Sequence, residues 1–99
     1  MASTKDYKNF IMEQLSLVDG ITCRPMMGEF ILYYNGVVFG GIYDDRFLVK
    51  KTDTNKEYEM EEALPYPKGS MMYLVDDVDN QDTLRDIVLD TCRGLPVKK

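Results

Sequence analysis

The sequence contains no histidine and no tryptophan, and it has only two cysteines, Cys23 and Cys92. Two distant thiols without a histidine do not make a zinc site. In a reducing compartment both are expected to be free, and buried cysteine most often serves as a small hydrophobe. Asp44 and Asp45 could act as paired acids, but no histidine, lysine or further acid near them completes a mechanism. The sequence therefore predicts a protein that is not an enzyme and has no metal or cofactor.

Membrane and nucleic-acid signals are also scarce. No apolar segment approaches the length of a membrane span, and the first residues lack the apolar core of a signal peptide. Acidic residues outnumber basic ones by 17 to 12, which gives a formal net charge of -5. Proteins that hold phosphate backbones normally present a basic face. We expect a cytoplasmic protein without membrane contact, for which direct DNA binding is unfavourable.

The length and the hydrophobic content of the chain suit a domain with one small core. The chain has 99 residues, of which 44% are hydrophobic, so residues 1–99 are expected to form a single domain. Apolar residues at helical spacing predict a first helix from Asp6 to Asp19, capped by Ser3 or Thr4, with Gly20 as its left-handed C′ residue.

Residues 22–51 change to a strand pattern. The predicted strands are Thr22–Met27, Glu29–Tyr34, Val37–Tyr43 and Arg46–Lys51, with Pro25 placing the first at an edge or bulge. Asn35-Gly36 is the strongest hairpin signal, because both central residues of a type I′ turn need positive φ. Asp44-Asp45 marks a second turn.

A tight turn at Asn35-Gly36 predicts which side chains share a face of the sheet. It pairs Tyr34 with Val37 and Leu32 with Phe39. One face then carries Phe30, Leu32, Tyr34, Val37 and Phe39, and the other carries Ile31, Tyr33, Val38 and Ile42. Short helices can cover one such face but scarcely both. We therefore expect the second face, or an exposed edge strand, to be buried in a homodimer or against a partner.

The second half of the chain is less regular. Thr54 to Glu57 fits a capping box and predicts a short helix ending near Glu62. A loop with Pro65 and Pro67 follows, then a strand from Met71 to Val75. Asp79 or Asn80 caps a last helix that ends at Gly94 as C′ residue, Leu95 and Pro96. The fold class is thus α+β, in the order α-β-β-β-(β)-α-β-α.

Three further features have structural explanations. The acids from Asp76 to Asp82 resemble a calcium loop, but the glycine and glutamate positions of that motif are wrong, so we interpret them as a helix N-terminus. Gly40-Gly41 indicates a bulge or a close approach, most simply of a helix. The pairs Met26-Met27 and Met71-Met72 fit a core better than a partner surface.

The segment from Arg24 to Lys51 resembles the N-terminal domain of the TfoX/Sxy family. The similarity rests on Met27-Gly28, on Tyr33-x-x-Gly36, and on a strand that reaches the Asp44-Asp45 turn before a lysine-terminated strand. Leu64-Pro65-Tyr66, the Met71-Met72 strand and the closing helix also fit. The resemblance implies a secretion-chaperone-like two-layer arrangement with an antiparallel sheet flanked by helices. It also implies kinship with competence regulators that help a cyclic-AMP receptor protein at promoters, here as a short member without the helical C-terminal domain.

The resulting hypothesis is a non-enzymatic protein-interaction module, of the transcriptional co-activator type, with a factor of the cyclic-AMP receptor type as partner. Exposed aromatic and methionine side chains tend to anchor interfaces. The candidate partner contacts are Met26, Met27, Tyr33, Tyr34 and Tyr43. One alternative is direct nucleic-acid binding through Arg24, Arg46, Lys50 and Lys51. Another is a small-molecule site near Cys23 or Gly40-Gly41.

Overall fold

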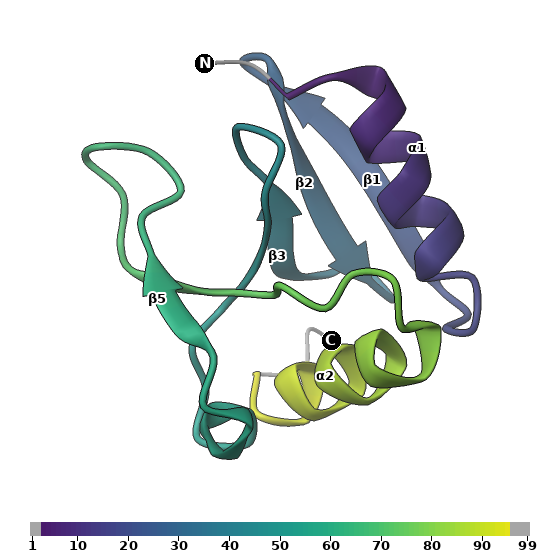
Figure 1. The fold of residues 1–99 in the computed structure, drawn as a ribbon, viewed down its shortest axis with the longest axis vertical. Helices are drawn as coiled ribbons and strands as arrows, with labels where there is room; N and C mark the ends of the chain where they lie inside the picture. The colour runs from purple at the N-terminus through teal and green to yellow at the C-terminus, as the bar shows by residue number, and fades with distance from the viewer. Residues whose placement is uncertain (1–2, 96–99) are drawn as a thin grey trace.

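The computed structural model describes residues 3–95, which fold into one antiparallel sheet with helices on one side (Figure 1). The helices are α1 (Lys5–Gln14) and α2 (Gln81–Arg93), and η1 (Lys56–Tyr58) is a single 3-10 turn. The strands are β1 (Ile21–Met26), β2 (Glu29–Tyr34), β3 (Val37–Ile42), β4 (Phe47–Val49), β5 (Glu61–Ala63) and β6 (Met72–Leu74). Their order across the sheet is β1-β2-β3-β4-β6-β5, so the predicted α+β class is confirmed.

Both helices pack on the same face of the sheet, which we call the helix face. Ile11 and Leu15 at α1 belong to the same buried cluster as Leu84 and Val88 of α2. The strands contribute Leu32, Phe39, Ile42, Phe47 and Val49 to that cluster. The main hydrophobic core therefore lies between the two helices and this face.

The helix ends follow local capping chemistry, with one difference from expectation. The Thr4 hydroxyl accepts from the Tyr7 N–H, and the Asn80 side chain accepts from the Thr83 N–H, so both predicted caps are present. However, α1 ends at Gln14, not at Asp19, because the backbone tightens into turns after Leu15. Gly20 does have positive φ, at 88°, but it leads into β1 and packs against Asn35.

The end of α2 also differs from expectation. Gly94 follows Arg93 as predicted, but its φ is -90°, so it is not a left-handed C′ residue. A Cβ there would lie 2.4 Å from Thr54 Oγ1, so glycine is required for close packing. Pro96 lies outside the described residues.

Tight turns at Asn35-Gly36 and Asp44-Asp45 join β2 to β3 and β3 to β4. Asn35 and Gly36 have φ values of 49° and 85°, as a type I′ turn requires. Asp44 and Asp45 also have positive φ, and Tyr43 and Arg46 exchange both backbone hydrogen bonds across them. The hairpin prediction at Asn35-Gly36 and the turn at Asp44-Asp45 are confirmed. β1 is an edge strand, as Pro25 predicted.

A β-bulge changes the predicted register after the first two pairs of the hairpin. Tyr34 faces Val37 and Tyr33 faces Val38, but Leu32 faces Gly40, which leaves Phe39 as the extra residue. The expected pairing of Leu32 with Phe39 is therefore wrong. The bulge turns Ile42 to the helix face, where it packs with Phe39, instead of to the opposite face.

We expected a helix to pack closely against Gly40 and Gly41, but this prediction is wrong. Neighbouring strand backbone and the Tyr43 ring lie there instead. A Cβ on Gly40 would lie 2.2 Å from the Leu48 carbonyl oxygen. A Cβ on Gly41 would lie 2.7 Å from the Phe30 carbonyl oxygen and from the Tyr43 ring. Only glycine allows the strands to approach this closely at the bulge.

The predicted helix from Thr54 to Glu62 is wrong, and a buried asparagine shows why. Asn55 Nδ2 donates to the Lys50 carbonyl and to Thr91 Oγ1, each at 2.8 Å, while its Oδ1 accepts from the Thr52 N–H. The Thr54 hydroxyl donates to the Asp90 carbonyl instead of capping a helix. These long-range bonds fold the segment against α2, and only η1 and then β5 form.

Candidate functional site

The face of the sheet opposite the helices, which we call the open face, is apolar at its centre. One row of paired residues crosses five strands on this face: Ile31, Gly41, Leu48, Leu74 and Glu61. Arg24 extends the row onto β1. Ile31, Leu48 and Tyr43 form a second buried cluster with Val38 and Met72 at its margin. Something other than a helix must therefore exclude water here.

The cover is the irregular segment 64–71, between β5 and β6. Arg46 fastens it, because its Nη2 donates to the Leu64 carbonyl at 2.9 Å and its Nε to the Tyr43 carbonyl at 3.2 Å. The Tyr66 ring lies 6.1 Å from the Tyr43 ring, and Pro65 is buried. Tyr43 is left only 6% exposed, and burial raises the pKa of its hydroxyl.

The segment covers only part of the open face. Beside it lies a shallow hollow of about 380 Å³ that opens to solvent. Val38, Gly40 and Met72 line it from the strands, and Tyr66 and Met71 line it from the segment. Tyr66 and Met71 are exposed large hydrophobic residues, at 52% and 43%. Apolar residues that stay accessible in a concave site are typical of a protein-binding surface.

Basic side chains border the hollow. Lys50 and Lys51 contribute to its lining, but the Lys51 ammonium lies toward the helix face, 3.1 Å from Glu62 and 5.6 Å from the centre of the Tyr73 ring. On the next strands, the Arg24 guanidinium lies 5.9 Å from the centre of the Tyr33 ring, and Tyr33 pairs with Val38. The open face therefore joins an apolar hollow to cations, on a chain whose net charge is -5.

The predicted contact residues are distributed over several surfaces. Tyr33 lies on the open face, half-buried beside Arg24, whereas Tyr34 packs at the margin of the helix-face core. Tyr43 is buried beneath Tyr66, and Met26 and Met27 lie at the tip of the β1–β2 hairpin, where Met27 is 96% exposed. The structure does not bring these five residues together.

Among the predicted basic contacts, Lys50 lines the hollow and Arg24 lies farther along the open face beside Tyr33. Arg46 holds the segment, and Lys51 pairs with Glu62. Sequence reasoning missed Tyr66 and Met71 as site residues. The Met71-Met72 pair and the proline-rich loop were the available signals, but neither shows where the loop folds.

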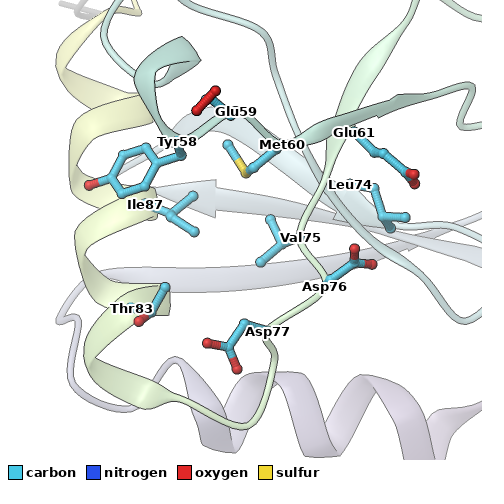
Figure 2. Close-up of a pocket in the computed structure, with 10 residues that line it drawn as sticks. All are labelled: Tyr58, Glu59, Met60, Glu61, Leu74, Val75, Asp76, Asp77, Thr83 and Ile87. Atoms are coloured by element: carbon cyan, nitrogen blue, oxygen red, sulfur yellow. The ribbon is translucent and has the colours of Figure 1, made fainter.

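A second hollow, of about 310 Å³, lies between β6, η1 and α2 (Figure 2). Its apolar lining includes Met60, Val75 and Ile87, and its acidic lining is Glu59, Glu61, Asp76 and Asp77. Within residues 3–95 no group of three or more potential metal ligands comes together. Beside it, Tyr58 donates to Asp90 Oδ2, and burial together with this bond raises the Tyr58 pKa to about 12.

Neither thiol is prepared for nucleophilic chemistry. Burial raises the pKa of Cys92 to about 11. Burial also raises the pKa of Cys23, although Lys8 acts in the opposite direction. Reactive cysteines have lowered pKa values, whereas the pKa values of both of these thiols are raised.

Comparison with known proteins identifies the family. The TfoX N-terminal domain matches residues 13–91, which is most of the chain. The chain belongs to the TfoX N-terminal domain family. A protein of Spirochaeta aurantia, described as an uncharacterized 12.7 kDa protein in the trpE 5' region, is 30% identical over 102 residues. The alignment covers 100% of this chain and 89% of that relative. The suspected resemblance is thus confirmed at the level of the family.

The TfoX match spans α2 almost to its end and includes the whole sheet and the segment 64–71. The open face and its hollow are therefore parts of the family's domain. No helix within residues 3–95 is both long and apolar enough to cross a membrane.

Proposed function

We propose that this TfoX N-terminal domain is a non-catalytic protein-interaction module of the regulatory type, and that it binds its partner through the open face. The observation that carries the proposal is the hollow beside the segment 64–71. There Tyr66 and Met71 remain exposed next to the half-buried Val38 and Met72. Large apolar side chains in a concavity bury area efficiently when a partner covers them.

The chemistry of the site favours binding over catalysis. The titratable groups that line the hollow are Tyr43, Tyr66, Lys50 and Lys51. Burial raises the pKa of Tyr43, and Lys51 forms an ion pair with Glu62. An acid–base pair needs two groups placed to move one proton. These groups supply apolar area and positive charge, which are the ingredients of recognition.

The family kinship supports a regulatory partner. Competence regulators that this domain resembles act beside a factor of the cyclic-AMP receptor type, so such a factor is the first partner to test. The acidic net charge of -5 favours a protein contact over a phosphate contact.

The test is affinity capture from native lysate with three immobilised proteins: the wild type, Met71→Asp and Leu17→Asp. Leu17 is also an exposed apolar residue, at 47%, but it follows α1 and lies away from the open face, so it is a matched control. Proteins held by the wild type and by Leu17→Asp, but lost from Met71→Asp, would support the proposal. Recovery of a cyclic-AMP receptor-type factor would identify the regulatory role. Equal retention by all three proteins would overturn binding through this face.

A further inference from the structure

The hollow on the open face is bordered by positive charge, although the chain as a whole is acidic. Lys50 lines it, and Arg24 lies beyond Tyr33 on the same face. Lys51 also contributes to the lining, but its ammonium lies toward the helix face, beside Glu62 and the Tyr73 ring. The strand registers place Arg24 opposite Ile31, and Ile31 belongs to the open-face cluster. Two cations, Lys50 and Arg24, thus flank the accessible apolar surface, while Glu61 is the one acid in the paired row that crosses this face.

This charge distribution limits which partners can bind in the hollow. In a two-fold dimer through the open face the same patch of both copies meets, so a surface flanked by cations would lie against an equal one. Like charges placed opposite one another oppose association. A second copy of this chain is therefore a poor occupant of the hollow.

Nucleic acid is also a weaker fit than an acidic protein. Phosphate binding scales with the number of cations that neutralise the backbone. Of the four basic residues considered for that role, Arg46 is committed to the Leu64 and Tyr43 carbonyls and Lys51 to Glu62. The floor of Val38 and Met72 offers apolar contact instead of hydrogen-bond donors.

We infer that the hollow receives a partner segment carrying a large apolar side chain flanked by Asp or Glu. The apolar side chain lies over Val38 and Met72, against Tyr66 and Met71. The flanking carboxylate faces the Lys50 ammonium, and a second acid can reach Arg24. This inference rests on the proposed function and names the chemistry of the partner at the same site.

The test is selection of a phage-displayed random peptide library on the wild type, with removal of phage that still bind Met71→Asp. The selected peptides are expected to be enriched in Asp or Glu beside Leu, Ile, Phe or Trp. A selected peptide, made synthetically with a fluorescent label, should bind Lys50→Glu about tenfold more weakly than the wild type. Lys5→Glu makes the same charge change at the exposed start of α1, so its affinity should stay within about twofold of the wild type.

The outcomes separate the two claims. Peptides that depend on Met71 but carry no excess of acids, or that bind Lys50→Glu as well as the wild type, would overturn the acidic-segment inference and leave the proposed function standing. A selection that yields no peptide dependent on Met71 would overturn both. The same variants are also tested with a labelled random-sequence oligonucleotide. If it binds the wild type and Lys5→Glu with a steep salt dependence but does not bind Lys50→Glu, the ligand of the hollow is nucleic acid and not a peptide.

Discussion

The two faces of the sheet are both apolar, but they are covered by different kinds of structure. On the helix face, α1 and α2 bury Leu32, Phe39 and Phe47 completely. On the open face, one irregular segment covers Tyr43, while Val38 and Tyr33 stay half-buried. A regular helix presents an apolar stripe along its whole length, whereas a loop covers only what a few side chains reach. The helix face therefore buries the main core, and the open face keeps apolar surface accessible to solvent.

The two faces should differ most in how much stability is lost when a large side chain is shortened to alanine. Phe39→Ala on the helix face removes a ring with no exposed surface and should lower the free energy of unfolding by about 4 kcal/mol. Tyr33→Ala on the open face removes a ring that is only half-buried and should cost about 1 kcal/mol. Urea unfolding of both variants measures the difference. Equal losses would show that the open face carries as much of the core as the helix face.

A buried polar contact on the helix side gives the next largest effect. Asn55→Ala leaves the Thr52 N–H, the Lys50 carbonyl and the Thr91 hydroxyl without the amide that satisfies them. Since each buried group that loses its partner costs about 1–3 kcal/mol, we expect a loss of about 3 kcal/mol in all. Thermal unfolding measures it, and Lys56→Ala, at an exposed neighbouring position, is the control. A loss below about 1 kcal/mol would mean that water replaces the amide.

How far the sequence predicts these features depends on the range of the interactions that form them. The turns at Asn35-Gly36 and Asp44-Asp45 were predicted because their backbone angles depend on the residues in the turn itself. The helix expected after Thr54 did not form, because that hydroxyl bonds to the Asp90 carbonyl 36 residues away. The bulge at Phe39 was missed for a similar reason, since it depends on how β2 and β4 approach the two glycines.

The candidate site shows the same limit. Arg24, Lys50 and Tyr33 were identified from their residue types. Strand alternation places Arg24 and Tyr33 on the open face, and Lys50 lines its hollow. Tyr66 and Met71 were missed because their role depends on where the segment 64–71 folds. Arg46 sets that position through the Leu64 carbonyl, 18 residues along the chain. No local pattern reports such a contact.

Loosening the cover of the open face should have a smaller effect on stability. Tyr66→Ala removes the ring beside Tyr43, but Tyr66 is already 52% exposed, so we expect a loss of about 1 kcal/mol. The change should be concentrated locally, with faster amide hydrogen exchange in residues 64–71 and unchanged exchange in α2. Hydrogen exchange measured by mass spectrometry resolves the two regions. Faster exchange in both would show that the segment is part of the main cooperative core.

The smallest predicted effect is a gain in stability. It concerns the tip of the β1–β2 hairpin, which neither the helices nor the segment 64–71 covers. Met27 has a φ of 52° and is 96% exposed, so a residue with a Cβ holds a left-handed conformation and gains almost no burial in return. Glycine adopts this conformation without the steric cost, although it raises the entropy of the unfolded chain. Met27→Gly should therefore raise the free energy of unfolding by about 0.5 kcal/mol, measured by urea unfolding with Met26→Gly as the destabilising control.

If Met27→Gly instead lowers stability, the methionine side chain makes contacts that its exposure does not show. If it also weakens partner capture while Leu17→Asp does not, the binding surface extends from the hollow to this hairpin.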